Sequence, residues 1–180
     1  MPLMPIVFAP DRRLKTVCKP VEQVDDDART LMQNMLETMY DAPGIGLAAP
    51  QVGDERRIIV VDVAREGEEP EPYLMVNPEL TWVSDDKIMM NEGCLSLPDI
   101  FVDVERPEAV RVAYTDPDNV RHEIEADGLF ARCVQHEIDH LNGILHVDYL
   151  SRIKRDLTLR KLARTKPSLM AERAKATALS

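Results

Sequence analysis

The chain has 180 residues, of which 44% are hydrophobic and 30% are charged, a balance that is ordinary for one soluble globular domain. No stretch approaches the roughly 18 consecutive apolar residues of a transmembrane helix, so no contact with a membrane is expected. Three cysteines are an odd number in a sequence whose first residues, MPLMPIVFAP, lack the pattern of a signal peptide, so reduced thiols are expected rather than disulfides.

Charge is divided unevenly along the sequence. Residues 151–180 contain nine lysines and arginines against two acidic residues, a net charge of +7, whereas residues 1–150 contain 13 against 30, a net charge of −17. We therefore expect one folded domain over residues 1–150, followed by a basic helix or tail over residues 151–180. Charge alone favours a solvated helix face in the second segment, and contact with a polyanion is the alternative.

The first predicted helix covers residues 25–44. Its apolar residues recur at spacings of three and four, which is typical of an amphipathic helix. Acidic residues crowd its N-terminal end, where the helix dipole favours them, and Pro43-Gly44 is expected to end it.

Several strands are expected after this helix. The apolar run in RRIIVVDV predicts a strand over residues 56–63, and a charged loop follows over residues 66–72. Apolar and polar residues then alternate in several of the segments expected to be strands, at residues 73–83, 87–93, 100–104, 109–116 and 120–126. The turn residues TDPDN, at 115–119, are expected to join the last two strands as a hairpin.

The pattern becomes helical again after residue 126. Asp127 is expected to cap a helix that Asn142-Gly143 ends. Ser151 is expected to cap a last helix with Ile153, Leu157 and Leu162 as its apolar stripe. The expected class is α+β, with mostly antiparallel sheets packed around the central helix, an N-terminal amphipathic helix and a C-terminal basic helix.

The central helix contains the H-E-x-x-H pattern of zinc hydrolases, formed by His136, Glu137 and His140. Positions four apart on a helix lie about 40° apart around its axis, so the two histidines project from one face and can bind one ion. Glu137 lies about 100° further round, beside the ion, where a base could deprotonate a metal-bound water. A lone histidine is more often a hydrogen-bonded core residue, but this combination predicts a metal site.

Catalytic zinc sites usually have three protein ligands, and the sequence offers more than one candidate for the third. His146 completes the longer metzincin protease signature if the helix breaks at Gly143. The alternation in GILHVDYL, however, predicts that His146 faces outward from a strand. Cys94 lies in an extended segment that can approach the helix, and a thiolate with two imidazoles is an accepted ligand set. Chemistry favours Cys94 and leaves both open, while Cys133 fits a small apolar wall better than a ligand.

Three segments together resemble the peptide deformylase family. They are GIGLAAPQ (44–51), EGCLS (92–96) and QHEIDHLNG (135–143), in the order and with the spacing of that family. Alternate glycines also occur in phosphate-binding loops, but here a helix precedes and a strand follows, so a tight turn is the plainer interpretation. The resemblance covers most of the chain. It implies that Cys94, His136 and His140 bind the metal and that His146 does not.

The resemblance also implies the reaction, which is hydrolysis of the formyl group from the N-terminal formyl-methionine of new polypeptides, with release of formate. Glu137 is implied as the general base. The Gln51 side-chain amide and the backbone N–H of Leu95 are implied as donors to the developing oxyanion. The implied pocket for the methionine side chain is formed by Ile45, Leu129, Cys133 and the stem of His136, and Gly46 is implied to lie along the substrate groove.

Family members commonly use Fe(II), and Zn, Ni or Co can occupy the same site. Ferrous iron beside a thiolate implies sensitivity to oxygen. The family arrangement also implies that Arg106 pairs with Glu92 and holds the cysteine segment. Arg132 and Phe101 are departures, because some members have an aliphatic residue and an arginine at these two positions.

The implied partners are N-formyl-methionyl nascent peptides, and residues 151–180 are a candidate for contact with ribosomal RNA. A bacterial cytoplasm is the expected location, with an organelle as the alternative. Two rival functions follow from the residues: a metzincin-like metalloendopeptidase that uses His146, and a binding protein without catalysis. The presence of both Glu137 and Gln51 argues against the second rival.

Overall fold

The computed structural model describes residues 2–65 and 67–177, and of residues 165–177 it describes the backbone only. Within these residues the chain forms three α-helices, three short 3-10 helices and seven strands. None of the helices described combines the length and the apolar character needed to cross a membrane. This mixture of helices with antiparallel sheets agrees with the α+β class expected from the sequence.

The strands form two separate antiparallel sheets. The larger sheet has the order β1 (Gly46–Ala48), β2 (Ile58–Val61), β3 (Tyr73–Val83), β6 (Ala109–Thr115) and β7 (Arg121–Asp127). The smaller sheet is the hairpin of β4 (Lys87–Cys94) and β5 (Leu97–Pro107). The hairpin expected around residues 115–119 is confirmed, because β6 pairs with β7 up to Thr115 and Arg121.

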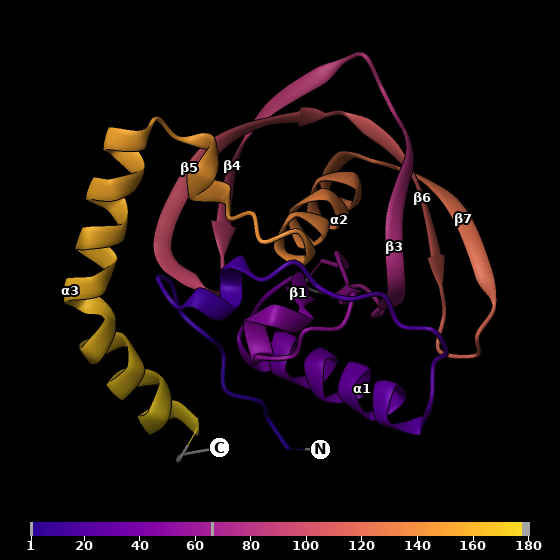
Figure 1. Cartoon of the computed structure of the whole chain (residues 1–180), viewed down its shortest axis with the longest axis horizontal. Helices are drawn as coiled ribbons and strands as arrows, with labels where there is room; N and C mark the ends of the chain where they lie inside the picture. Colours follow the sequence, from indigo (N-terminus) through magenta and orange to yellow (C-terminus); the bar gives the residue numbers. More distant parts are fainter. Residues whose placement is uncertain (1, 66, 178–180) are drawn as a thin grey trace.

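The helix α2 (Gly128–Leu141) lies between the β4–β5 hairpin and the larger sheet, as Figure 1 shows. Asp127 is its N-cap residue, although the Asp127 side chain accepts no hydrogen bond from the helix. The chain turns away after α2 at Gly143, whose φ of 72° is a left-handed conformation that favours glycine.

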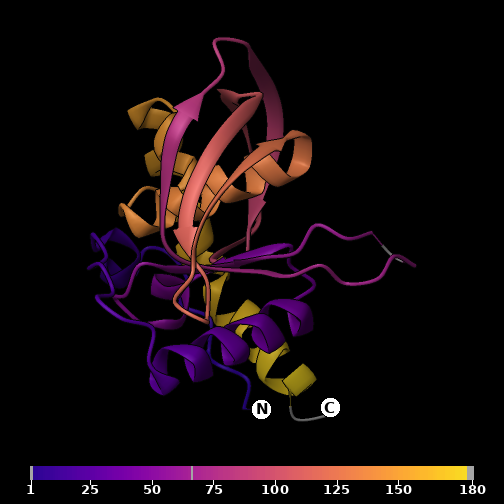
Figure 2. The ribbon, with the colours of Figure 1, turned by 90° about the vertical axis from the view of Figure 1, so that its right-hand side faces the viewer.

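The helix α1 (Asp26–Asp41) packs on the opposite face of β2 from α2 (Figure 2). Ile58 and Val60 belong to the core that α1 covers, whereas Ile59 and Val61 belong to the core shared with α2. Successive side chains of a strand point to opposite faces, so burial on both faces explains the continuous apolar run of β2.

The segment expected to be a tight turn before residue 52 contains more structure than the sequence predicted. β1 pairs with β2 in antiparallel register, with Gly46 opposite Val61, and the 3-10 helix η2 (Ala49–Val52) follows directly. The interpretation as a plain turn was wrong, because β1 depends on hydrogen bonds to a strand ten residues and more away. A second 3-10 helix, η1 (Arg12–Lys15), precedes α1.

The helix α3 (Arg152–Thr177) runs along the outer side of the hairpin (Figure 1). Its expected apolar stripe was wrong in two of three positions, because Ile153 and Leu157 are 74% and 60% exposed. Leu162 is buried, and Leu159, three residues earlier on the same helix face, packs against the same core. The side chains of three expected basic residues, Lys166, Arg173 and Lys175, lie outside the described residues.

Candidate metal centre

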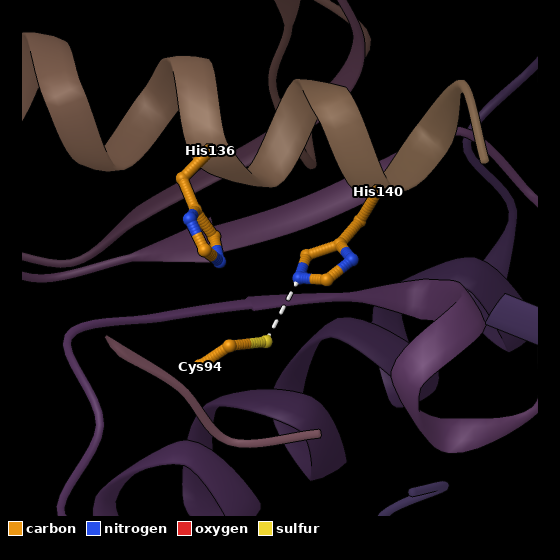
Figure 3. A group of neighbouring side chains, drawn as sticks. All are labelled: Cys94, His136 and His140. Atoms are coloured by element: carbon orange, nitrogen blue, oxygen red, sulfur yellow. Dashed lines mark hydrogen bonds between the residues drawn. The ribbon is translucent and has the colours of Figure 1, made fainter. Parts of the chain in front are cut away.

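Two elements that are distant in the sequence bring three metal-binding side chains together. His136 and His140 project from one face of α2 toward Cys94 (Figure 3). One potential ligand atom from each residue lies within 4.8 Å of the other two, and the Cys94 Sγ is 3.2 Å from Nε2 of His140. Among the described residues, Cys94, His136 and His140 form the group of histidine, cysteine and acidic side chains whose ligand atoms lie close enough together to hold a metal ion.

Cys94 reaches the helix from the end of a strand rather than from a loop. It is the last residue of β4, and an irregularity in the pairing with β5 separates Glu92 from Cys94. Gly93 lies at this irregularity, and a Cβ there would come within 2.9 Å of the Phe101 ring. Glycine at position 93 therefore leaves space for the Phe101 ring beside the strand that carries Cys94.

Glu92 orients the ring of His136. Its Oε2 lies 3.0 Å from Nδ1 of His136, which leaves Nε2 of that ring directed toward Cys94. Such a contact fixes the tautomer and the orientation of a histidine that binds a metal. Burial alone would raise the pKa of the Glu92 carboxyl, but hydrogen bonds from His136 and Arg106 lower it to about 2.

Arg106 completes the support of Glu92, as the family resemblance implied. Its Nε and Nη2 donate to the two carboxylate oxygens of Glu92 at 2.6 and 2.9 Å, and both side chains are buried. A bidentate pair of this kind is geometrically specific, so it restrains the carboxylate in two directions. The expected pairing of Arg106 with Glu92 is confirmed.

Glu137 lies beside the three candidate ligands with one oxygen free. Its side chain is buried, and Oε2 has no hydrogen-bond partner among the described residues. Burial raises the pKa of Glu137 to about 7. Buried carboxylate oxygens are nearly always hydrogen-bonded. Because Oε2 has no partner among the described residues, it is available to accept a hydrogen bond from a water molecule or a substrate.

Gln51 approaches the same site from η2. Its Oε1 accepts a hydrogen bond from the backbone N–H of Ala48 at 2.8 Å, which fixes the amide orientation. Its Nε2 donates to Ser96 Oγ at 3.1 Å and lies 3.6 Å from the Cys94 Sγ. Sequence reasoning missed Ser96, because an isolated serine gives no pattern that would identify it as a partner of Gln51.

A cavity of about 400 Å³ opens beside these groups. Its lining includes Ile45, Gly46, Leu95 and Cys133, together with Gln51, Glu137 and the candidate ligands Cys94 and His136. Leu129, which was expected in the pocket, does not line the cavity. It lies near the start of α2, seven residues before His136, whereas the α2 residues that line the cavity are Arg132, Cys133, His136 and Glu137.

His146 contradicts the expectation of an outward-facing strand residue. It begins the 3-10 helix η3 (His146–Tyr149) and is only 1% exposed, with its Nε2 3.2 Å from the carbonyl oxygen of Ile100. The alternation of GILHVDYL predicted a strand, in which His146 would point away from its buried neighbours Leu145 and Val147. The chain forms the 3-10 helix η3 instead, so the His146 ring also points inward. The His146 ring centroid lies 5.8 Å from that of His136, and His146 is not part of the candidate ligand group.

The donor set fits a divalent transition metal. One cysteine and two histidines provide the three protein ligands that a catalytic zinc site usually has, and imidazole also suits iron and nickel. Nδ1 of the buried His140 has no hydrogen-bond partner among the described residues, and Glu137 Oε2 is free as well. Three converging donors with a free carboxylate oxygen beside them leave room for a metal with a water molecule.

Comparisons with known proteins give a consistent result. A family model described as polypeptide deformylase matches residues 3–156. The peptide deformylase of Methylocella silvestris is 53% identical over 164 residues, which cover 89% of this chain and 84% of that protein. The peptide deformylase of Agrobacterium fabrum is 52% identical over 164 residues, covering 91% of this chain and 96% of that protein.

Solved structures agree with these sequence matches. The crystal structure of peptide deformylase from Ehrlichia chaffeensis has a TM-score of 0.89 at 39% identity and covers 94% of this chain and 99% of its own. A structure from the same organism in complex with actinonin has a TM-score of 0.88 at 43% identity, with 92% and 98% covered. These matches do not support the metzincin-like alternative. The chain belongs to the polypeptide deformylase family.

Proposed function

We propose that the cavity beside Cys94, His136 and His140 is the centre at which this chain removes the formyl group from N-formyl-methionyl peptides. The observation that supports this proposal best is the convergence of three soft or borderline donors beside a buried carboxylate with a free oxygen. Members of this family are metal-dependent hydrolases that act on nascent N-formyl peptides, so the three donors are proposed to be the metal ligands.

The metal is proposed to be Fe(II), with Zn, Ni or Co as substitutes that the same donors accept. A divalent ion held there would lower the pKa of water and polarise the formyl oxygen. Cys94 would contribute a thiolate, whose negative charge reduces the Lewis acidity of the ion. We expect the iron-loaded protein to lose activity in air. Unchanged formate release after long aeration of that protein would contradict iron as the working metal.

Glu137 is the proposed general base. Its free Oε2 takes the proton from the attacking water, whose oxygen forms the new bond to the formyl carbon. The same oxygen then gives the proton to the amine nitrogen as the carbon–nitrogen bond breaks. Formate and the free methionyl peptide are the products.

Gln51 and Leu95 are the proposed oxyanion donors. The Gln51 amide is held by Ala48 and Ser96, so it is already oriented before substrate binds. Preorganised donors of this kind stabilise developing charge without reorganisation, and each contributes on the order of 3 kcal/mol to the transition state.

The methionine side chain is proposed to enter the apolar part of the cavity. Ile45, Gly46, Cys133 and the stem of His136 form this part. Burial raises the pKa of the Cys133 thiol well above its ordinary value, so the thiol stays protonated and is a poor nucleophile. Cys133 is therefore proposed to contribute a small apolar surface to the pocket.

Residues 1–150 are proposed to form the catalytic unit, and the basic segment 151–180 is proposed to contact ribosomal RNA. Arg152, Lys154, Arg160 and Arg164 are all exposed along α3. A deformylase acts on chains that emerge from the ribosome, so a cationic helix would bring the cavity near its substrate. The cytoplasmic location expected from the sequence stays a prediction.

The experiment that tests the proposed catalytic centre is formate release from an N-formyl-methionyl tripeptide. The protein is prepared without oxygen, loaded with Fe(II) and compared with the variant Glu137→Gln, which keeps the size and polarity of the side chain. We expect formate from the parent protein and a loss of at least 100-fold in the variant, because general bases contribute about 10²- to 10⁴-fold. Equal rates in the two proteins would contradict the proposed base.

A further inference from the structure

Two residues close to the candidate ligands have no part in the chemistry described so far. Asp139 lies on α2 between His136 and His140, and Tyr149 is the last residue of η3. The Tyr149 hydroxyl donates a hydrogen bond to Oδ2 of Asp139 at 2.8 Å. Arg106 Nη1 donates to the same oxygen at 2.8 Å. One carboxylate oxygen therefore joins η3 to the arginine that supports Glu92.

Arg106 divides its guanidinium between two carboxylates. Nε and Nη2 bind Glu92, and Nη1 binds Asp139, while the three side chains are only 4–16% exposed. The guanidinium is planar and its N–H groups form a rigid fork, so any rotation that improves one contact weakens the other. The position of Asp139 therefore determines how Arg106 meets Glu92.

Tyr149 restrains both members of the Arg106–Asp139 pair. Its hydroxyl oxygen is also 3.4 Å from Arg106 Nη1, and the guanidinium carbon lies 5.2 Å from the centre of its ring. Among Arg106, Glu92 and Asp139, the Asp139 side chain is the most exposed. Without the Tyr149 hydroxyl, the Asp139 carboxylate would therefore lose a hydrogen bond from a fixed donor and accept one from mobile water instead. Rotation of that carboxylate would loosen the contact of Arg106 with Glu92.

The network ends at a metal ligand. Glu92 Oε2 lies 3.0 Å from Nδ1 of His136, so movement of Glu92 is transmitted directly to that ring. We infer that Tyr149 is a positioning residue for the metal centre and acts on His136 through the hydrogen bonds of Asp139, Arg106 and Glu92. This inference rests on the proposed metal site and adds a residue from outside the cavity to its support.

The test compares Tyr149→Phe with the parent protein, because this change removes the hydroxyl and keeps the ring over Arg106. Both proteins are loaded with Co(II), and affinity is measured by competition with a chelator. Outer contacts of metal ligands typically contribute 10- to 100-fold in affinity, so we expect Tyr149→Phe to bind Co(II) about 10-fold more weakly. The visible absorption of bound Co(II) is also expected to shift, since it reports the orientation of the ligands.

Tyr73→Phe is the matched control. The Tyr73 hydroxyl makes an exposed contact with Glu71 at 3.3 Å, and neither residue belongs to the network, so its removal is expected to leave Co(II) affinity unchanged. The unfolding midpoint of each metal-free protein is measured as well. A lower midpoint for Tyr149→Phe with unchanged Co(II) affinity would assign Tyr149 a structural role only and overturn the inference.

A double-mutant cycle tests the route. In the background Glu92→Gln, where the carboxylate no longer links Arg106 to His136, Tyr149→Phe is expected to change Co(II) affinity less than twofold. A full 10-fold loss in that background would show that the effect does not pass through Glu92 and would overturn the proposed route. Failure of the parent protein itself to bind Co(II) would contradict the metal site, and with it this inference.

Discussion

The alternate glycines of GIGLAAPQ have a steric role at the scale of single residues. A Cβ on Gly46 would lie 2.5 Å from Oε1 of Glu137 and 2.6 Å from the Cys133 Sγ, both shorter than ordinary contacts. A Cβ on Gly44 would meet only the end of the Leu95 side chain, at 2.7 Å from Cδ1. Gly46 therefore lets β1 approach the proposed base, a requirement quite different from that of a phosphate-binding loop.

We expect Gly46→Ala to lower kcat by about 100-fold, because displacing a catalytic group by about 1 Å has an effect of this size. Glu137 is buried, and the new methyl group would press on its Oε1, so the carboxylate would have to move from its position in the site. Steady-state formate release measures the effect, and metal content shows that the ligands are intact.

Gly44→Ala is the matched comparison for Gly46→Ala. The far end of Leu95 can rotate away from the new methyl group, so a much smaller loss of kcat is expected. Parent-like kcat in Gly46→Ala would contradict the steric account of this glycine.

Among the candidate site residues, the sequence predicted those with a local pattern. His136, Glu137 and His140 share a helix, so their spacing alone placed them on neighbouring parts of its surface. Cys94 and His146 could not be separated in this way, because the choice depends on how β4 and η3 pack against α2. Burial of His146 and its contact with Ile100 are tertiary facts that no local spacing contains.

At the scale of elements, the helices and long strands were predictable because their patterns are local. The helix expected over residues 25–44 is α1, and its N-cap Asp25 accepts a hydrogen bond from the Ala28 backbone N–H at 2.8 Å. β1 and η3 were not predictable. Each has fewer than five residues, and each depends on pairing or packing with segments that are distant in the sequence.

We expect Asp25→Ala to lower the free energy of unfolding by about 1 kcal/mol, because the first turn of α1 loses its side-chain cap. α1 covers one face of β2, so fraying of its first turn is expected to weaken core packing as well as the helix end. Chemical denaturation followed by circular dichroism measures the change.

Asp85→Ala is the control for the cap. Asp85 is an exposed residue between β3 and β4, and such surface changes are usually within about 0.5 kcal/mol of the parent. If Asp25→Ala proved as stable as this control, the cap would have no measurable role in α1.

At the scale of the whole molecule, the acidic body and the basic α3 are one structure with opposite charges. The helix is attached to the body through Leu159 and Leu162, and Arg155 lies 3.6 Å from the carboxylate of Asp148. The helix runs beside the β4–β5 hairpin (Figure 1), and Arg152, Lys154, Arg160 and Arg164 are exposed along it. This arrangement gives the polyanion interpretation of residues 151–180 more weight than charge alone did.

We expect binding to ribosomes to weaken steeply with salt and to be reduced when Arg152, Lys154, Arg160 and Arg164 are all changed to Gln. Each phosphate contact that is lost lowers the slope of log affinity against log salt by about 0.7–0.9. Sedimentation with purified ribosomes over a range of salt concentrations measures this slope.

The control for this prediction is the free tripeptide substrate, which does not need the ribosome. Formate release from that substrate is expected to be the same in the quadruple variant and in the parent protein. Ribosome binding that is independent of salt, or equal in the two proteins, would contradict the proposed contact.

We propose that Cys94, and not His146, completes the metal site with His136 and His140. The most direct measurement is the near-ultraviolet absorption of the Co(II)-loaded protein, in which a thiolate ligand gives an intense charge-transfer band. We expect this band in the parent protein and in His146→Gln, which keeps a donor for the Ile100 carbonyl, and we expect its loss in Cys94→Ala. A band that persists in Cys94→Ala, or metal binding that is lost in His146→Gln, would contradict the account.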